Sequence, residues 1–556
     1  MRMLSTRKAA FFSFAAGSFL LMNAFSPSQV VASTEIDELK KKITDMQETI
    51  DEMDDRLNEA ELHTSTDKVS FGVEMRTKAD SIHYDNMQFA PQSMIQGFFT
   101  PFTFVGDPFG GFQGATLQQA TDMMDMMKTF GMVPPTESYD FDNGNIWTSK
   151  FHLNMKSKVN NNLSFAGRLA AYKVWGDSSG VKFNSGSLGD VTFDGNTTSL
   201  PHGDTMRLER AYFNYKNQAG SVPFNLSFGR RPSTDGPPRE YGNYSLEGGS
   251  PIATIINWQF DGASLSFGLE ELATIPGFAF KLCYGVGFEG DWGNSYSINA
   301  TADVDDVHLM GFIWSLFDDD THKVEMNYAH ASDITDGFTG LTVMPFIVSK
   351  SDHDGNPATD DIYTFTQNAG GFISRMQPMT NIGDWDALTM LFRTNVADFD
   401  MFLSGSWSHT EPEHISTNPF YELMGQGLLN SNGDMEKRDG YMILVGAVIP
   451  MPLEAKLGLE YNWGSKYWFN FTGAEDSLIG SKMAVRGQVY EGYYIQPIYG
   501  DTFFLKAAYQ YYDYEYTGSG NPMGEPVKID EATGLDALFP IVDKAWTANL
   551  SATLRF

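Results

Sequence analysis

The chain ends with Trp546-Thr547-Ala548-Asn549-Leu550-Ser551-Ala552-Thr553-Leu554-Arg555-Phe556. Every second residue from Trp546 to Phe556 is apolar, and the residues between them are polar. Because successive side chains of a β-strand point to opposite faces, such a strand has one apolar and one polar face. A tilted strand of about ten residues with this alternation suits a transmembrane β-barrel. The segment therefore predicts a membrane-spanning strand.

The same alternation recurs from Val69 onward. We expect sixteen such strands, at residues 69–82, 148–158, 163–175, 205–216, 223–231, 258–268, 277–290, 303–315, 322–332, 385–396, 399–409, 439–449, 453–464, 482–495, 501–515 and 544–556. The short connections are residues 159–162, 217–222, 269–276, 316–321, 397–398, 450–452 and 496–500. The long connections lie near residues 83–147, 176–204, 232–257, 291–302, 333–384, 410–438, 465–481 and 516–543.

Short and long connections alternate along the whole chain. An up-and-down barrel with tight periplasmic turns and long outer loops has this asymmetry, whereas a sandwich with Greek-key crossings does not. The sequence therefore predicts an all-β fold, a transmembrane antiparallel up-and-down β-barrel of about sixteen strands formed by residues 65–556. Tryptophans where a strand meets a long loop are expected to form the outer aromatic girdle. They are Trp147, Trp175, Trp258, Trp292, Trp385, Trp407, Trp463 and Trp546.

Two segments precede the predicted barrel. Residues 1–32 have the basic start, apolar run and small-residue ending of a secretory signal peptide. Residues 33–64 carry an a/d heptad seam from Ile36 to Ala60, which predicts a short periplasmic coiled-coil helix. Because so narrow an apolar stripe pairs with copies of itself, we expect this segment to mediate oligomerisation. A lone solvated helix is the alternative.

Composition and motifs exclude several classes of function. The formal net charge of −32 argues against nucleic-acid binding, because phosphates require a basic surface. Cys283 is the only cysteine, so the chain has neither an internal disulfide nor a haem-attachment motif. No Walker or His-Glu-x-x-His motif is present. We therefore expect a protein that is not an enzyme and has no cofactor or metal.

Fixed charges on the inner wall of a barrel focus the electric field on passing ions. On the predicted register the inward acids are Glu74, Glu209, Glu325, Glu454 and Glu460. The inward bases are Arg76, Lys150, Lys156, Lys158, Arg168, Arg207, Arg231, Lys281, Lys323, Arg393, Lys456, Lys482, Arg486 and Lys506. Bases outnumber acids, so the lumen is expected to be basic and the outer loops acidic. The alternative is that these charges pair with one another and merely fill the lumen.

The compositions of two long connections predict where these connections lie relative to the barrel. The connection 232–257 contains Asp235, Arg239 and Glu240 beside the bend Gly236-Pro237-Pro238. If it folds inward, its acids face the basic wall across a constriction; the alternative is an ordinary surface loop. The connection 83–147 is rich in Phe and Met. A loop this apolar is expected to pack into the lumen or against a neighbouring subunit.

Parts of the chain resemble known outer-membrane proteins. The terminal Leu550–Phe556 resembles the assembly signal of Gram-negative outer-membrane barrels, and Arg207–Tyr215 with Phe224–Arg230 resembles the hairpin before the constriction loop of general porins. The whole chain resembles an uncharacterised outer-membrane family that joins a coiled coil to such a barrel, with Gly229–Pro238 carrying much of the likeness. The resemblance implies an outer-membrane location, contact with lipid and lipopolysaccharide, and recognition of Phe556 by the barrel-assembly machinery.

The leading hypothesis is a trimeric porin, a passive diffusion channel for ions and small hydrophilic solutes. Its expected pore-lining and constriction residues are Arg76, Lys150, Lys156, Arg168, Arg207, Arg231, Asp235, Arg239 and Glu240. A second hypothesis is a barrel that sheathes a separate periplasmic multihaem cytochrome, which requires another polypeptide and a lumen without a constriction loop. A third, uptake of hydrophobic substrates, rests only on the Phe-rich loop.

Overall fold

The structure is a computed structural model of the 556-residue chain. It describes residues 42, 46, 69–99, 114–176, 206–232, 236–237, 253–290, 304–336, 340–343, 346–352, 355–356, 358, 360–367, 373–376, 378–474, 477–538 and 540–556. The chain divides into two compact units, Met1–Lys68 and Val69–Phe556. The predicted signal peptide and, apart from Lys42 and Met46, the predicted coiled coil lie outside the described residues.

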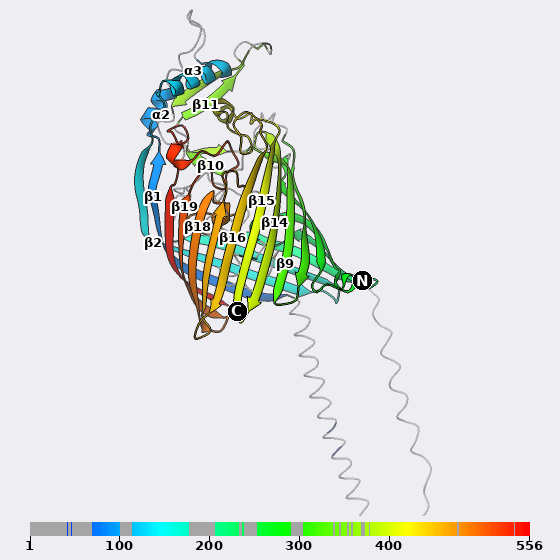
Figure 1. The fold of residues 1–556 in the computed structure, drawn as a ribbon. Coiled ribbons are helices and arrows are strands. Elements are labelled where there is room, and N and C mark those ends of the chain that lie inside the picture. The colour runs from blue at the N-terminus through cyan, green and yellow to red at the C-terminus, as the bar shows by residue number, and fades with distance from the viewer. Residues whose placement is uncertain are drawn as a thin grey trace, which may run out of the picture. The chain divides into compact units, whose positions relative to one another are not determined.

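Sixteen antiparallel strands close into a barrel, as predicted (Figure 1). In order around the barrel they are β1 (Ser70–Phe89), β2 (Glu137–Lys158), β3 (Leu163–Val174), β4 (Arg207–Ala219), β5 (Val222–Arg230), β6 (Asp261–Gly268), β7 (Ala279–Phe288), β8 (Val307–Asp318), β9 (His322–Thr335), β14 (Asn381–Val396), β15 (Phe399–Pro412), β16 (Arg438–Pro450), β17 (Lys456–Gly464), β18 (Gly487–Tyr499), β19 (Phe503–Tyr514) and β20 (Lys544–Arg555). β20 pairs with β1 from Arg555↔Glu74 to Lys544↔Asp85, which closes the ring.

The outer face of the barrel is apolar and the inner face is largely polar, because burial alternates along each strand. On β15, Leu403 is 50% exposed whereas Ser404 is completely buried. On β1, Met75 is exposed on the outside whereas Arg76 and Lys78 are buried on the inside. This pattern fits a wall with lipid on one side and a polar lumen on the other.

The strands are joined by short turns at one end and by long connections at the other. The turn between β14 and β15 consists of only two residues, Ala397 and Asp398, which have φ values of 54° and 65°. Positive φ at both positions is the geometry of the two-residue turns whose twist matches paired strands. The observed turns lie at the predicted short connections, but the turn before β17 runs from 451 to 455. Glu454, predicted to face inward from a strand, lies in this turn and is exposed.

β1 and β2 are longer than predicted and shorten the first long connection to residues 90–136. Ile82 and Tyr84 continue the inward alternation of β1, and Met87 is also buried after a register shift between Tyr84 and Met87. These residues are buried in one hydrophobic cluster with Ile479 and Val485. Residues from a distant connection therefore support the extended hairpin from inside the barrel.

Two connections enter the lumen, and we call residues 253–260 inner segment 1 and residues 465–486 inner segment 2. They pair with each other: the Phe471 N–H donates to the Ile255 carbonyl at 2.9 Å, and the Asn257 N–H donates to the Phe471 carbonyl at 3.0 Å. β6 and β18 begin later than predicted, at Asp261 and Gly487, because the residues before them belong to the inner segments.

Inner segment 2 packs against the wall formed by β9 and β14–β16. Trp468, Phe469 and Phe471 are fully buried there. The facing wall has small inward residues, Ala329, Ala331, Ala387, Ser406, Ser408 and Gly440. A Cβ atom at Gly440 would lie 2.6 Å from the Trp468 Cα atom, so only glycine allows this approach. The chain's own loops thus fill this side of the lumen.

Buried hydrogen bonds fasten both inner segments to the wall. Ser406 Oγ on β15 donates to Thr254 Oγ1 at 3.0 Å, and Thr254 Oγ1 donates to Thr389 Oγ1 on β14 at the same distance. The Phe469 N–H donates to Ser408 Oγ at 3.3 Å. These bonds satisfy polar groups that would be costly to bury unpaired.

The prediction of an outer tryptophan girdle is wrong for two of its members. Trp258 and Trp385 are fully buried inside the barrel, in the cluster that holds inner segment 2. Trp258 precedes β6 within inner segment 1, and Trp385 occupies an inward position of β14. Trp147 and Trp175 are exposed on the outside, with stacked rings whose centroids are 5.5 Å apart. Trp292 lies outside the described residues.

The long connections contain the remaining elements. These are α2 (Gln92–Phe99), α3 (Leu117–Thr129), β10 (Gly340–Val343), β11 (Phe346–Ser351), β12 (Ile362–Gln367), β13 (Ile373–Met376), α7 (Pro419–Met424), η3 (Lys482–Ala484) and η4 (Ile529–Glu531), with α5 (Glu270–Ala273) in a turn at the opposite end. None of the described helices is both long and apolar enough to cross a membrane.

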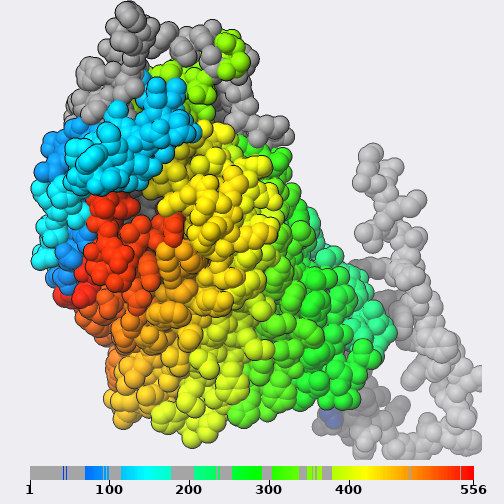
Figure 2. Space-filling model, turned by 45° about the horizontal axis from the view of Figure 1, so that its top comes forward, coloured from blue at the N-terminus to red at the C-terminus, as the bar shows by residue number. Residues whose placement is uncertain are grey.

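An apolar cluster joins several outer loops where α2, α3 and β11 lie (Figures 1 and 2). Phe98 of α2 and Met124 of α3 pack there with Tyr363 of β12 and Phe420 of α7. The described part of the Phe- and Met-rich connection is therefore buried against other outer loops of the same chain. For this described part, the arrangement corrects the expectation that the connection packs into the lumen; packing against a neighbouring subunit stays a prediction.

Candidate functional site

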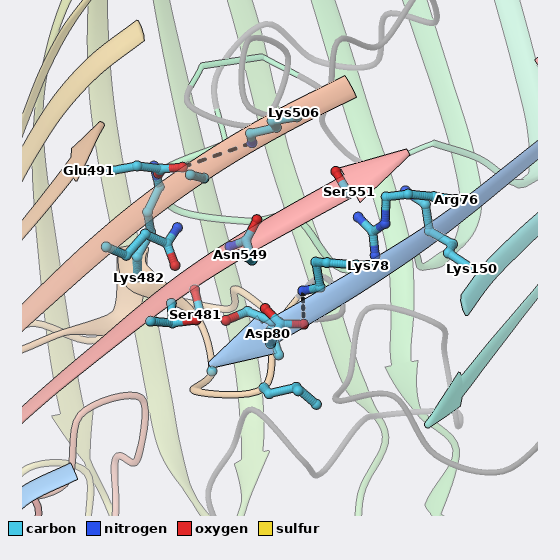
Figure 3. A pocket seen from close by; sticks show the side chains of 18 of the residues that line it. Arg76, Lys78, Asp80, Lys150, Ser481, Lys482, Glu491, Lys506, Asn549 and Ser551 are labelled. Carbon is cyan, nitrogen blue, oxygen red and sulfur yellow. Dashed lines mark hydrogen bonds and ion pairs between the residues drawn. The ribbon is translucent and has the colours of Figure 1, made fainter. Parts of the chain in front are cut away.

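A cavity of about 150 Å³ lies inside the barrel, between the inner segments and the opposite wall (Figure 3). Its wall side is formed by inward residues of β1, β2, β18, β19 and β20. Its other side is formed by inner segment 2, from Gly473 to Met483, together with Ala253 and Asn257 of inner segment 1. We call it the luminal cavity.

Five basic residues line the luminal cavity: Arg76, Lys78, Lys150, Lys482 and Lys506. Arg76, Lys78 and Lys150 are only 7–9% exposed, so they face an enclosed space rather than bulk water. They come from neighbouring strands, and Arg76 is the direct cross-strand partner of Lys150. Like charges directly opposite each other on paired strands destabilise the pairing, so this face of the wall carries a cost.

Three acidic residues line the same cavity and offset part of its charge. Asp80 lies 3.2 Å from Lys78, Glu74 lies 3.5 Å from Lys150, and Glu491 lies 4.0 Å from Lys506 and also contacts Lys482. Five bases and three acids leave a formal excess of two positive charges among the lining residues. This local excess contrasts with the net charge of −32 for the whole chain.

Uncharged polar groups complete the lining. β20 contributes alternate inward residues, Thr547, Asn549, Ser551 and Thr553. Ser551 pairs with Lys78 of β1 on one side and with Lys506 of β19 on the other. The small serine side chain therefore lies between two lysines on the inner face of three consecutive strands (Figure 3).

Lys482 attaches inner segment 2 to the wall. Its Nζ atom contacts the carboxylates of Glu460 on β17 and Glu491 on β18. Tyr493 Oη also donates to Glu460 Oε1 at 3.1 Å. Burial alone would lower the pKa of Lys482, but the two carboxylates raise it well above its ordinary value. The charged lysine is therefore a stable contact between the inner segment and the barrel.

A second cavity, of about 360 Å³, lies near the closing strand end. Lys156, Arg168, Arg555 and Phe556 belong to its lining, and Glu74 lines both cavities. The buried His152 lies 3.5 Å from both Glu74 and Glu209. Glu74, which lines both cavities, is therefore in contact with further ionisable groups of β2 and β4.

The structure brings some of the predicted pore-lining residues together. Arg76 and Lys150 line the luminal cavity, and Lys156 and Arg168 line the second one. Neither lining includes Arg207 or Arg231, whose Nη2 atom donates to the Tyr284 carbonyl at 3.3 Å. Of the predicted pore-lining residues, three lie outside the described part of the chain: Asp235, Arg239 and Glu240. The end of their loop does enter the lumen, as inner segment 1.

The sequence analysis did not include Lys78 and Asp80 among the inward residues. Both are an even number of residues from Arg76 on the same strand, so they face the same side of the sheet. The sequence analysis also placed Lys482 and Arg486 on a strand, whereas both belong to inner segment 2 before β18. The aromatic run Trp468-Phe469-Asn470-Phe471 could have revealed that segment. A loop with three large aromatic rings is expected to pack away from water, like the Phe- and Met-rich connection 83–147.

No group of three or more His, Cys, Asp or Glu residues is arranged to hold a metal ion within the described part of the chain. The cavities are lined mainly by charged and hydroxyl groups, which can attract and hydrogen-bond small solutes.

A closed barrel of sixteen antiparallel strands, with a polar lumen narrowed by its own loops, is a porin-like β-barrel. The chain belongs to the family described as "Protein of unknown function (DUF3373)", whose model matches residues 140–556.

Solved outer-membrane barrels are similar to the chain over most of its length. OmpT of Vibrio cholerae in its trimer form is 13% identical, with 88% of this chain and 99% of that chain covered and a TM-score of 0.39. OprB of Pseudomonas putida is 11% identical, with coverage of 88% and 94% and a TM-score of 0.41. An anion-selective porin from Comamonas acidovorans is 9% identical, with coverage of 88% and 99% and a TM-score of 0.40. No curated protein matches the chain.

Proposed function

We propose that this protein is an outer-membrane porin, a passive diffusion channel for ions and small hydrophilic solutes, and not an enzyme. The observation that carries the proposal is the charged luminal cavity, enclosed between the barrel wall and the chain's own inner segments. Fixed charges in a low-dielectric enclosure focus the field on a passing ion. The excess of bases along this path favours anions over cations.

The exterior supports a membrane location for the channel. Exposed residues such as Met75, Leu403 and Leu554 alternate with inward polar residues along their strands. Such an exterior gains free energy in lipid, at about 25 cal/mol per Å² of apolar surface removed from water. Outer-membrane lipid and lipopolysaccharide are the corresponding contacts, and a homotrimer formed with help from the N-terminal segment is the proposed assembly.

The two other hypotheses receive less support. A sheath for a separate multihaem cytochrome requires a lumen wide enough for another polypeptide. Inner segments 1 and 2 already pack against β9 and β14–β16 inside the barrel. Hydrophobic uptake rested on the Phe-rich connection, but its described part packs among outer loops, and the luminal cavity is lined mainly by polar side chains.

The test is a planar-bilayer recording of the purified full-length protein in a salt gradient. Reversal potentials should show anion preference, and neutralising Lys150 and Arg168 together should shift selectivity toward cations. The matched control is Lys323→Gln, which removes a positive charge from β9 outside both cavity linings. Because free ions screen charges over about 8–10 Å at physiological salt, both the preference and its shift should weaken as salt rises.

A protein that inserts but conducts no ions would reject the channel. Reversal potentials unmoved by the Lys150 and Arg168 changes at low salt would reject these residues as its selectivity determinants. The same recording tests the prediction that Asp235 and Glu240 face the lumen: if they do, neutralising both should shift selectivity toward anions.

A further inference from the structure

We propose that the luminal cavity is a saturable binding site for small oxyanions, meaning anions that carry phosphate, sulfate or carboxylate groups. The inference deepens the proposed channel function, because it assigns a solute class and a binding step to the conduction path. It starts from the arrangement of like charges on four adjacent strands, β2, β1, β20 and β19.

Two rows of inward residues cross the seam of the barrel, which is the pairing of the first strand β1 with the last strand β20. In one row Lys150 of β2, Arg76 of β1 and Thr553 of β20 are successive cross-strand partners. In the next row Lys78 of β1, Ser551 of β20 and Lys506 of β19 are successive partners. Four cations therefore lie on one patch of wall with Ser551 between two of them, Lys78 and Lys506 (Figure 3), and Thr553 lies beside Arg76.

Repulsion among the cations of this patch favours the binding of an anion. Directly opposed like charges such as Arg76 and Lys150 destabilise paired strands. Glu74 and Asp80 offset part of the repulsion, and Glu460 and Glu491 both contact Lys482. With Glu460 counted beside the lining residues, one base remains in excess of the acids. An anion placed among the cations would neutralise the remainder. In an enclosed site its attraction is stronger than in water, because the effective dielectric constant is lower.

The uncharged lining favours an oxyanion over other small solutes. Hydroxyl groups of Ser551, Thr553 and Ser481 can donate to oxygen acceptors that point in several directions, while Arg76 offers a guanidinium fork suited to phosphate and carboxylate. A sugar site would need exposed aromatic faces, but the lining rings Phe504 and Tyr512 are 2% and 1% exposed. The chemistry of the patch therefore matches charged oxygen groups.

The size of the cavity agrees with a small anion that keeps some of its water. One water molecule needs about 10–15 Å³ on this measure of volume. The luminal cavity has about 150 Å³, enough for a phosphate-sized solute and a few waters. A large anion such as a nucleotide would have to displace inner segment 2.

The first experiment measures binding without requiring conduction. Inorganic phosphate is titrated calorimetrically into the detergent-solubilised full-length protein, and saturable binding is expected. Ser551→Asp places a carboxylate between Lys78 and Lys506 without removing any charged residue of the wall, so it should fold. It should weaken phosphate binding at least about tenfold, because its charge competes for the same cations. Ser551→Asn is the uncharged control and should retain binding.

The second experiment measures the binding step during conduction. Added phosphate should reduce the single-channel chloride current to a saturating level, and Ser551→Asp should remove this inhibition. Sulfate and succinate in place of phosphate distinguish the source of the oxyanion chemistry. Inhibition by all three supports a general oxyanion site, whereas inhibition by one alone identifies its group.

The outcomes separate this inference from the proposed channel. Phosphate binding that Ser551→Asp weakens, in a protein that conducts no ions, would support the site and reject the channel. A conducting channel with no saturable phosphate binding would reject the site and leave the channel intact. Phosphate binding of equal strength in the wild type and in Ser551→Asp would place the anion elsewhere and overturn the inference.

Discussion

Arg486 Nη2 donates a hydrogen bond to Asn430 Oδ1 at 2.7 Å, although the two residues belong to different connections. The same guanidinium donates to the carbonyls of Trp468, Thr517 and Asn521 at 3.0–3.1 Å. Burial lowers the pKa of Arg486 to about 9, which leaves it charged at neutral pH. One buried cation thus holds together inner segment 2 and two outer loops.

Arg486→Gln should loosen these loops while the barrel remains closed. Several buried acceptors would lose their donor at about 1–3 kcal/mol each, so the loops should open more easily by on the order of 3 kcal/mol. Amide hydrogen exchange at residues 428–431 and 516–521 should then accelerate about 100-fold. Lys528→Gln, which removes an exposed base from the same outer region, should leave exchange unchanged. Unchanged exchange in Arg486→Gln would contradict this role.

Lys482→Met should release inner segment 2 from the wall. Removing one partner of a buried ion pair costs about 3–5 kcal/mol, and here it would leave Glu460 and Glu491 facing each other without their shared lysine. We expect a larger single-channel conductance and a shift toward cations. Lys482→Arg should keep the wild-type conductance. Lys466→Met removes an ion pair with Glu525 from the same segment and serves as the control. Equal conductance in all four proteins would show that Lys482 does not hold the segment.

Asp336 should make one outer contact pH-dependent. Burial raises the pKa of its carboxyl group above the ordinary 3.8, although the Met379 N–H donates to it at 2.8 Å and Ser416 also donates to it. Because the folded pKa is higher than the unfolded one, the stabilisation is complete below 3.8 and is lost as pH rises through the folded value. The melting temperature of wild type relative to Asp336→Asn should therefore fall as pH rises from 4 toward neutrality. Parallel pH profiles for the two proteins would be the contrary result.

Phe556 should matter for assembly in two separable ways. Its backbone forms two hydrogen bonds with Val73 across the seam, at 2.8 and 3.0 Å, and its ring is 75% exposed. Deleting Phe556 removes both features, whereas Phe556→Ala removes only the ring. If the assembly machinery reads the aromatic ring, both variants should reach the outer membrane at reduced levels, measured by membrane fractionation. A defect confined to the deletion would assign the effect to the seam, and normal levels of both would refute any role.

The strands could be predicted because lipid and lumen impose opposite demands on alternate residues, as Leu403 and Ser404 illustrate. The inward and outward positions of β4 are more difficult to predict. On β4, Leu208 and Phe213 are both exposed although their parities differ, because a register shift lies between them and both Glu209 and Arg210 are buried. A single additional residue changes which side chains face inward, and no composition pattern marks where it occurs.

The site could be predicted only in part. Arg76 and Lys150 followed from strand parity, and Lys78 would have followed from the same rule applied one step further. The inner segments lack any periodicity, since their positions depend on contacts with distant strands. Thr254 reaches Thr389 and Ser406, and Asn470 Nδ2 donates to the Thr254 carbonyl at 2.8 Å. Such contacts are absent from any local pattern.

The pairing of the two inner segments makes the interior of the barrel cooperative. Phe471 both donates to Ile255 and accepts from Asn257, so withdrawing either segment would strand backbone groups of the other away from water. Withdrawing one segment would therefore cost most of the free energy needed to withdraw both segments. We therefore expect the two segments to leave the wall together, so that a force applied to either one displaces the pair.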